Sequence, residues 1–325
     1  MDIRRRAQFG GIKKTSSGGG DIEIDTTYAI YYTSYDGNIV TPYTSDAFGA
    51  NIVSNNYVNG QGILSFDGPI TTIGKWAFSF CDSLTGITIP DSVTTIGYAA
   101  FASCTILTNV TIGDSVTAIG DYAFYNCTSL TGITIPDSVT TIGYAAFDSC
   151  TSLTNVTIGD SVTTIGEWAF AYCSSLTSVT IPESVTTIGY AAFDECSSLT
   201  SVAIGDSVTT IGDEAFCYCS SLTSITIPDS VTTIGERAFD SCTSLTNVTI
   251  PDSVTTIGEG AFYYCESLTS VYCEATTPPS LGGISVFDGN ASGRKIYVPA
   301  ASVKAYKSAE YWSKYSSAIV GYNFT

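Results

Sequence analysis

Cysteine is the residue type in this sequence with the widest chemistry, and most of the cysteines recur at one fixed spacing. They stand 23 residues apart, each three residues after a phenylalanine, at Cys81, Cys104, Cys127, Cys150, Cys173, Cys196, Cys219, Cys242 and Cys265. Such thiols could form disulfides, bind zinc or act as nucleophiles. The sequence contains no histidine, which removes the commonest general base and the usual catalytic metal ligand.

The fixed spacing decides among these uses of cysteine. A repeat of this length is typical of a solenoid, in which equivalent residues of successive coils lie roughly 4.8 Å apart. Parallel Cβ atoms at that separation fit disulfide geometry poorly, because bridged Cβ atoms lie at ~3.8 Å. Zinc needs a tetrahedral cluster, and the sequence offers only Cys217 beside Cys219. We therefore expect buried free thiols that pack as small hydrophobic residues, with no metal, no cofactor and no enzymatic activity.

A second column places one carboxylate in each coil, at the turn that follows the predicted strand. Its members are Asp91, Asp114, Asp137, Asp160, Glu183, Asp206, Asp229 and Asp252. Calcium could bind along the seven aspartates of this column, although one carboxylate per coil leaves each ion short of its usual six to eight oxygen ligands. The alternative is turn chemistry, in which an Asp after Pro or Gly accepts a local backbone N–H bond.

Two further sets of residues are candidates for contact with a partner. The outward residue of each predicted strand is usually threonine, and the set comprises Thr88, Thr111, Thr134, Thr157, Thr180, Thr226 and Thr249, with Tyr272 at its end. Aromatic residues vary beside the repeated Ala-Phe dipeptide, with Trp76 and Trp168 among them. Threonine also suits strands by its β-propensity alone, and the rings could pack on the next coil, so structural roles stay open for both sets.

The repeat predicts a leucine-rich-repeat-like solenoid with 23-residue coils, a parallel β-sheet on one face and short helical turns on the other. In one coil, Ile87 and Ile89 point inward and Thr88 points outward, by the two-residue alternation of a strand. The segment Val93–Ile96 crosses the next side of the coil. Phe101 then packs into the core from one or two helical turns.

The segments that flank the repeats predict caps at both ends. The domain boundaries are a flexible basic and Gly-Ser head at 1–20, an N-terminal β cap at 21–66, nine repeats at 67–273, and an irregular loop, last strand and helical C-terminal cap at 274–325. A cap is needed because the first and last coils would otherwise expose apolar side chains and strand edges.

Local signals add detail to these caps. Asp36-Gly37-Asn38 predicts a hairpin turn with a return strand at Ile39–Pro42, and Asn59-Gly60 predicts a second hairpin. Residues 63–66 carry the inward pattern of the next strand, which predicts them as the first rung of the sheet. Residues 300–311 predict a helix with Ser302 as its N-cap.

Charge excludes two classes of partner. Residues 70–273 contain 20 acids and two bases, within a chain of net charge −18. Nucleic acids and anionic membranes both need Lys and Arg at their interface, so neither is an expected partner. No apolar run approaches the length of a membrane span, and Met1–Gly20 contains no apolar stretch of the kind that a secretory signal requires.

The motif L-T-x-[IV]-T-I-[PG]-D-S-V-T-T-I-G-x-x-A-F-x-x-C recurs over residues 64–299 and resembles the repeat of the BspA-like leucine-rich repeat family of bacterial surface proteins. The resemblance implies a non-enzymatic protein, exposed on the cell surface or outside the cell, that contacts host matrix proteins or other cells. Surface members of this family normally carry an export signal or a lipid anchor, and neither is readable here. The resemblance supplies no functional residues to carry over.

Three functions fit these observations. The leading hypothesis is an adhesion or binding module that contacts a protein, another cell or a glycan through the repeat surface. The alternative is a structural or receptor-recognition component of a phage or prophage particle, suggested by the short basic head without an export signal. The third is an intracellular scaffold without a specific ligand. The identity of the ligand and the oligomeric state are left open by the sequence.

Overall fold

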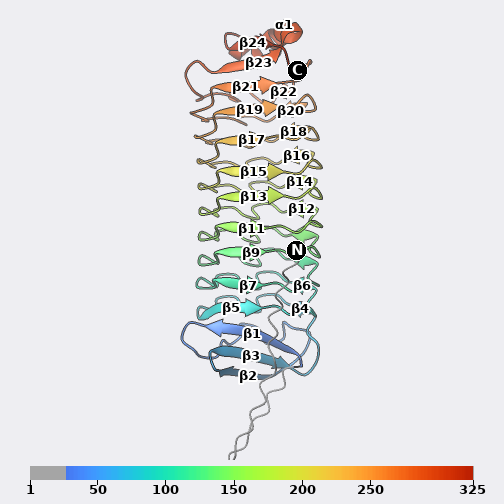
Figure 1. The fold of residues 1–325 in the computed structure, drawn as a ribbon, viewed down its shortest axis with the longest axis vertical. Helices are drawn as coiled ribbons and strands as arrows, with labels where there is room; N and C mark the ends of the chain where they lie inside the picture. Colours follow the sequence, from blue (N-terminus) through green and yellow to red (C-terminus); the bar gives the residue numbers. More distant parts are fainter. Residues whose placement is uncertain (1–26, 325) are drawn as a thin grey trace, which may run out of the picture.

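Each coil contributes two short strands, and most of these strands pair with their equivalents in the neighbouring coils. The computed structural model describes residues 27–324, which form one elongated solenoid with its coils stacked along the long axis (Figure 1). The predicted fold class is confirmed. The predicted head at 1–20 lies outside the described residues, as does the start of the predicted β cap.

The strands of the first face run the length of the array (Figure 1). In the repeats they are β5 (Leu84–Thr88), β7 (Asn109–Thr111), β9 (Gly132–Thr134), β11 (Asn155–Thr157), β13 (Ser178–Ile181), β15 (Ser201–Ile204), β17 (Ser224–Thr226), β19 (Asn247–Ile250) and β21 (Ser270–Cys273). Equivalent residues pair in register, as Val156 does with Ile133. Ile87 is buried and Thr88 is exposed, so the predicted alternation is confirmed.

A second parallel sheet lies where the sequence predicts only a crossing segment. Its strands are β4 (Thr72–Ile73), β6 (Thr95–Ile96), β8 (Ala118–Ile119), β10 (Thr141–Ile142), β12 (Thr164–Ile165), β14 (Thr187–Ile188), β16 (Thr210–Ile211), β18 (Thr233–Ile234), β20 (Thr256–Ile257) and β22 (Ser280–Leu281). Two residues per coil are too few to give a period in the sequence, so the pairing with neighbouring coils alone reveals this sheet.

The third side of each coil, at the Ala-Phe motif, consists of consecutive turns. The N–H of Ala123 donates three residues back within its own turn at 3.2 Å, whereas the N–H of Phe124 donates to Ala146 O of the next coil at 2.7 Å. Tyr122 and Asn126 take left-handed φ angles of 57°. Alternate N–H groups therefore point along the solenoid, which a continuous helix does not allow, and these bonds offset the cost of the left-handed residues.

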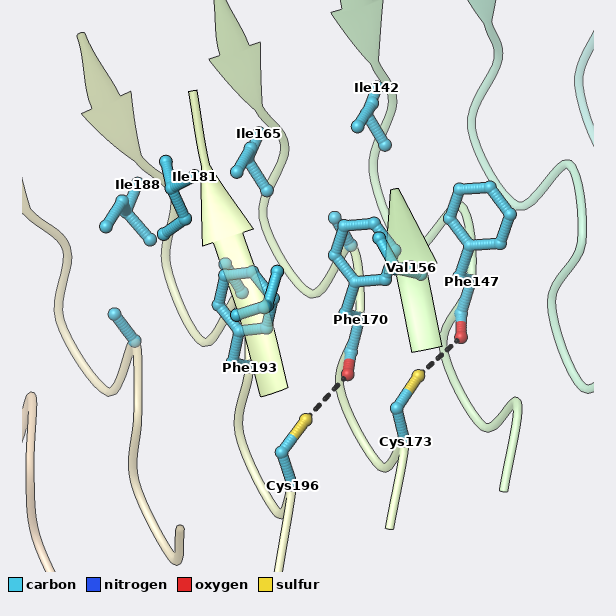
Figure 2. Packing of buried hydrophobic residues seen from close by; sticks show 14 of the residues in the cluster. Ile142, Phe147, Val156, Ile165, Phe170, Cys173, Ile181, Ile188, Phe193 and Cys196 are labelled. Atoms are coloured by element: carbon cyan, nitrogen blue, oxygen red, sulfur yellow. Dashed lines mark hydrogen bonds between the residues drawn. The ribbon is translucent and has the colours of Figure 1, made fainter. Parts of the chain in front are cut away.

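The phenylalanine column forms a ladder of stacked rings in the core. Neighbouring ring centroids lie 5.0–5.7 Å apart and their planes are within 8° of parallel, from Phe78 to Phe287. Figure 2 shows three of these rings, Phe147, Phe170 and Phe193, with two cysteines beside them. Phe48 of the N-terminal cap closes the ladder, with its ring edge-on to Phe78 at 5.7 Å.

The N-terminal cap is an antiparallel sheet of β1 (Ala29–Ser34), β2 (Ile52–Val58) and β3 (Gln61–Phe66). The strands β2 and β3 form the hairpin predicted at Asn59-Gly60. The predicted hairpin at Asp36-Gly37-Asn38 is wrong, because no strand of the described residues covers Ile39–Pro42.

The place of β1 corrects a second prediction about this cap. The strand lies between β3 and β5 and is antiparallel to both, so Tyr32 pairs with Gly62 on one side and Ile87 on the other. Residues 63–66 are therefore not the rung next to β5. Inward alternation is the same in either arrangement, because β1 also sends Ile30 and Tyr32 into the core, and the pattern cannot distinguish the two orders.

The C-terminal cap extends the first face and then covers the core. The strands β23 (Lys295–Pro299) and β24 (Ile319–Tyr322) continue the first face in parallel, and η1 (Ala300–Ser302), α1 (Val303–Ser308) and η2 (Trp312–Tyr315) lie between them. The prediction of Ser302 as a side-chain N-cap is wrong. Its hydroxyl donates instead to Thr276 O at 2.7 Å, because the irregular loop passes beside it.

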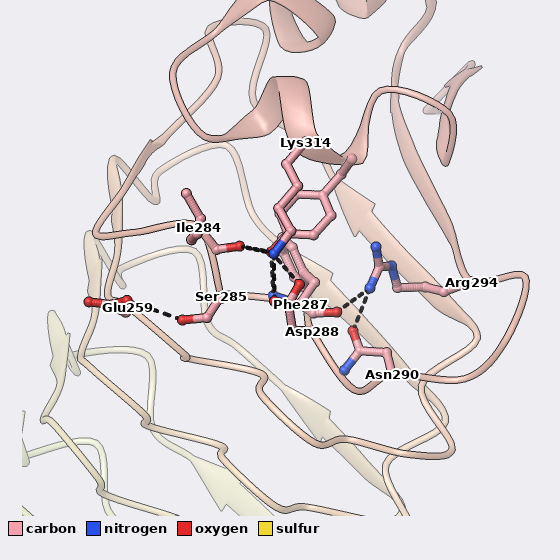
Figure 3. Close-up of polar contacts among 9 residues, drawn as sticks. Glu259, Ile284, Ser285, Phe287, Asp288, Asn290, Arg294 and Lys314 are labelled. Carbon is pink, nitrogen blue, oxygen red and sulfur yellow. Dashed lines mark hydrogen bonds and ion pairs between the residues drawn. The ribbon is translucent and has the colours of Figure 1, made fainter.

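Polar contacts fix the last loop of the array to this cap (Figure 3). Lys314 Nζ lies 2.5 Å from Asp288 Oδ2 and donates to Ile284 O at 2.9 Å. Arg294 donates to Asn290 Oδ1 at 2.9 Å and to the carbonyl oxygen of Phe287. The loop therefore carries the final ring of the phenylalanine ladder in a defined position.

Candidate functional site

The predicted outward threonines form a continuous surface, here called the threonine face. It comprises Thr88, Thr111, Thr134, Thr157, Thr180, Thr226 and Thr249, all of which are exposed. Other threonine columns use their hydroxyls within the array; Thr108 Oγ1, for example, donates to Thr85 O of the preceding coil at 2.9 Å. Within residues 27–324, the hydroxyls of the threonine face make no such bond, so they are free to bind an external partner.

Tyr272 ends the threonine face but does not extend it. Its ring stacks on Tyr297 at 4.7 Å and meets Tyr322 edge-on at 5.6 Å, and the side chain is half-buried. The structure thus places this predicted contact residue in an aromatic cluster with the C-terminal cap. Its packing there favours a structural role.

A depression of about 620 Å³ lies on the threonine face between β7 and β11. Gly132 has no side chain, and it stands between Asn109 and Asn155 on the neighbouring strands. The lining includes polar groups of three kinds, from Asn109, Thr111, Thr134, Asp137, Asn155 and Thr157. Hydroxyls, amides and the carboxylates of Asp114 and Asp137 therefore converge at one place on an otherwise uniform face.

The predicted acidic column is exposed, and the carboxylates of Asp91, Asp137 and Glu183 bond to the backbone of the next coil rather than locally. Asp91 Oδ1 accepts the N–H of Asp114 at 3.1 Å, and Glu183 accepts the N–H of Asp206 at 2.6 Å. The alternation of Pro and Gly explains this pairing, because a Cβ on Gly113 would lie 2.7 Å from Pro90 O. The sequence-based alternative is thus correct that these carboxylates accept backbone N–H bonds, but wrong that the N–H groups belong to the same turn.

Calcium gains no support from the arrangement of these acids. The column places one carboxylate at this turn of each coil, and no cluster of three Asp, Glu, Cys or His side chains suited to a metal occurs among residues 27–324. Calcium needs several oxygens at one point, and the column spreads its oxygens along the axis instead.

The predicted tryptophans belong to a longer row of rings, here called the aromatic stripe: Trp76, Tyr98, Tyr122, Tyr144, Trp168 and Tyr190. Ring centroids lie 6.2 Å apart for Trp76 and Tyr98, and 5.2 Å apart for Tyr122 and Tyr144. Trp168 meets Tyr190 at 5.5 Å. The contacting rings pack edge-on or tilted, in one run from Trp76 to Tyr144 and in the pair of Trp168 and Tyr190, and about 40% of Trp76 and of Tyr98 remains exposed.

The stripe forms because consecutive coils place their rings at different positions. In one coil the ring follows the glycine by two residues with a left-handed φ, as at Trp168 with 58°. In the next coil it follows the glycine directly, as at Tyr190, and a small residue, Ala191, comes after it. Two-coil duplication, visible in the sequence, thus produces one row rather than two.

Asp194 is a buried site that sequence analysis missed. It is 6% exposed, and its Oδ1 atom has no hydrogen-bond partner among the described residues. Burial, with the nearby charges of Glu195 and Glu214, raises the pKa of this carboxyl to about 7. The sequence contained one indication of this site, because Asp194 occupies a repeat position that other coils fill with a small apolar residue such as Ala171.

The equivalent carboxylate two coils later is buried but satisfied. Asp240 Oδ2 accepts Arg237 Nε at 2.8 Å, and its Oδ1 accepts the Ser241 hydroxyl at 2.8 Å. The two aspartates therefore occupy the same position of the repeat, but both oxygens of Asp240 are hydrogen-bonded whereas Asp194 Oδ1 is not. This contrast makes Asp240 a natural reference for Asp194.

The cysteine column is buried and its thiols are free, as predicted, and so are Cys217 and Cys273. The thiols of the column also donate along the axis, as Cys173 Sγ does to Phe147 O at 3.3 Å (Figure 2). Burial raises the pKa of the thiol at every one of these positions, for example to about 12 at Cys150. A neutral, enclosed thiol is a poor nucleophile.

We expect the native protein to resist thiol reagents. At pH 8, iodoacetamide should modify none of the eleven cysteines of the folded chain, as counted by intact mass. In about 6 M guanidinium, a concentration that unfolds even hyperstable domains, it should modify all of them. Rapid modification of Cys173 in the folded protein would show that the column is accessible.

None of the described helices is long and apolar enough to cross a membrane. The family model described as "BspA type Leucine rich repeat region (6 copies)" matches residues 54–177 and 163–281. No curated protein matches the chain significantly.

Several solved structures are similar to this chain. A leucine-rich repeat protein of T. pallidum is 36% identical, with a TM-score of 0.46, over 49% of this chain and 74% of that one. A leucine-rich cell surface protein of Faecalibacterium prausnitzii is 26% identical, with a TM-score of 0.37, over 86% and 95% of the two chains. A leucine-rich repeat protein of Bacteroides ovatus is 24% identical, with a TM-score of 0.41, over 83% and 90%.

Proposed function

Since the chain belongs to the BspA type leucine-rich repeat family, we propose that it is a non-enzymatic adhesion module that binds a protein of a host matrix or of another cell through the threonine face. The family is generally non-enzymatic and suggests a protein-binding repeat surface. The observation that carries the proposal is the row of exposed, unpaired threonine hydroxyls on the first face.

The chemistry of the threonine face suits a broad protein contact. Each hydroxyl can donate and accept hydrogen bonds, and its side-chain methyl group adds apolar contact area. The depression beside Gly132 adds the amides of Asn109 and Asn155 and the carboxylate of Asp137. A partner could therefore align its backbone polar groups with the strands and place one side chain in the depression.

Membership of the family supports a site of action at the bacterial surface, and the surface charge favours contact with a protein over contact with nucleic acid or lipid. The repeat block carries 20 acids and two bases, so phosphate groups would be repelled. Protein partners do not require a basic surface.

The test is a binding screen of the full chain against immobilised matrix proteins and glycans. We expect saturable binding to at least one protein, with retention of that binding in a control variant, Thr140→Ala. Thr140 is a suitable control because its hydroxyl is already bonded within the array, to Thr117 O at 3.2 Å. Binding to glycans alone, or to no component of the screen, would contradict the proposal.

A further inference from the structure

The two basic residues of the repeat block lie near opposite ends of the aromatic stripe, one over its rings and one beside a carboxylate that binds its last ring. Lys75 Nζ lies 4.1 Å from the ring centroid of Trp76 and 5.0 Å from that of Tyr98. At the other end, Arg237 lies 3.8 Å from Glu214, whose carboxylate accepts the Tyr190 hydroxyl at 2.8 Å. Lys75 therefore lies over rings at one end of the stripe, and Arg237 is connected to the other end through the Glu214 carboxylate.

The middle of the stripe has the same kinds of groups without a cation. Tyr122, Tyr144 and Trp168 supply the rings, and the exposed carboxylates of Asp121 and Glu167 precede two of them in the sequence. No lysine or arginine occurs between Lys75 and Arg237. An amine or guanidinium of another molecule would meet there rings of the kind that Lys75 covers, with carboxylates beside them in the sequence.

We propose that the middle of the aromatic stripe binds an extended, lysine- and arginine-rich polypeptide segment of a partner protein. Cations over the faces of Trp and Tyr are attracted by the ring electrons, and flanking carboxylates add to that attraction. A row of rings along the axis matches a linear segment with several basic side chains. The contact lies on the turn side of the coils, so it is separate from the threonine face and does not rest on it.

Charge selects this partner over a neutral glycan. Sugar rings also stack on aromatic side chains, but they carry no charge to meet Asp121 and Glu167. The internal precedent at Trp76 is an ammonium group, which is the group that a basic segment provides. An acidic partner would be repelled by the whole repeat block.

The test titrates the full chain with a fluorescent deca-lysine peptide and a neutral Gly-Ser peptide of equal length at roughly 0.15 M salt. Trp168→Ala and Tyr144→Ala should each weaken deca-lysine binding roughly fivefold, the loss expected for one cation–ring contact. Neighbouring coils hold Ala145 and Ala191 in the slot of Trp168, so the first variant is expected to fold. Lys75→Ala should strengthen binding roughly twofold, because it frees the site at Trp76.

The matched control is Tyr218→Ser, which removes a ring that is 44% exposed but lies outside the stripe. Ser241 fills the same slot in the next coil. This variant should bind deca-lysine as the wild type does. Equal affinity of the stripe variants and the wild type would show that acidic charge alone binds the peptide and would overturn the proposal. Binding of a neutral oligosaccharide in place of the peptide would overturn it as well.

Discussion

Replacing Phe170 by alanine is expected to lower the free energy of unfolding by about 3–5 kcal/mol. The ring is fully buried and stacks on Phe147 at 5.1 Å and on Phe193 at 5.4 Å. Alanine would remove the apolar area and leave a cavity that the backbone cannot close, because both sheets and the turns of this coil are hydrogen-bonded to the neighbouring coils. Urea denaturation of the full chain measures the change.

The matched control for this variant lies two residues along the same coil. Tyr172 is 42% exposed, and the preceding coil holds Ser149 in its place. Tyr172→Ser should therefore change the free energy of unfolding by less than about 1 kcal/mol. A loss of less than about 1 kcal/mol for Phe170→Ala would show that the ladder does not support the fold.

Replacing Asp194 by asparagine is expected to stabilise the protein above pH 7. The pKa of the carboxyl rises from its ordinary value of 3.8 to about 7 in the folded state. Between these values the folded state holds a proton that the unfolded state has released, so stability falls as the pH rises from about 4 to about 7 and stays low above that. Asparagine carries no charge, so it removes this loss, which is at most about 4 kcal/mol.

The measurement compares urea midpoints of the wild type and Asp194→Asn at pH 5 and pH 8. The stabilisation by asparagine should grow between the two pH values, because the wild-type penalty grows over that window. Asp240→Asn is the matched control. It weakens bonds to Arg237 and Ser241, and should destabilise the protein by about 1–3 kcal/mol at both pH values. An equal effect of Asp194→Asn at both pH values would contradict the raised pKa.

The repeated part of the fold was predictable because each column has one fixed direction. The positions equivalent to Phe170 and to Ile87 are apolar in every repeat, and Thr88 follows Ile87 on the opposite face of its strand, so burial follows from the sequence. The second sheet was not predictable, because Thr95 and Ile96 show no period of their own. Their strand exists only through pairing with the next coil.

The arrangement of the caps, by contrast with the repeats, was not predictable from the sequence. The order of β3, β1 and β5 depends on pairings between segments that are distant in the sequence, such as Tyr32 with Ile87. Local turn signals at Asp36-Gly37-Asn38 favoured a hairpin, but the residues that follow the turn form no strand. The position of Ser302 favoured an N-cap, in which its hydroxyl would accept a backbone N–H, but the hydroxyl instead donates to Thr276 O of a neighbouring loop.

The candidate surfaces were predictable in position but not in their hydrogen bonds. The sequence places Thr134 and Asp91 on the outside, yet only the structure shows that the hydroxyl is free and that the carboxylate bonds to the next coil. The aromatic stripe follows the same rule. Its rings are visible in the sequence, whereas their contact depends on the left-handed residues of the turns, such as Trp168.

In the proposed function, inward side chains stabilise each coil and outward threonines bind the partner. One triple variant tests this division directly: Thr111→Ala/Thr134→Ala/Thr157→Ala. These threonines line the depression, and Ala203 shows that the column accepts alanine. The measurement is the dissociation constant for the protein identified in the screen, together with the melting temperature. We expect at least about tenfold weaker binding, the loss of a few hydrogen bonds, with an unchanged melting temperature. Unchanged affinity in a folded triple variant would contradict the role of the threonine face.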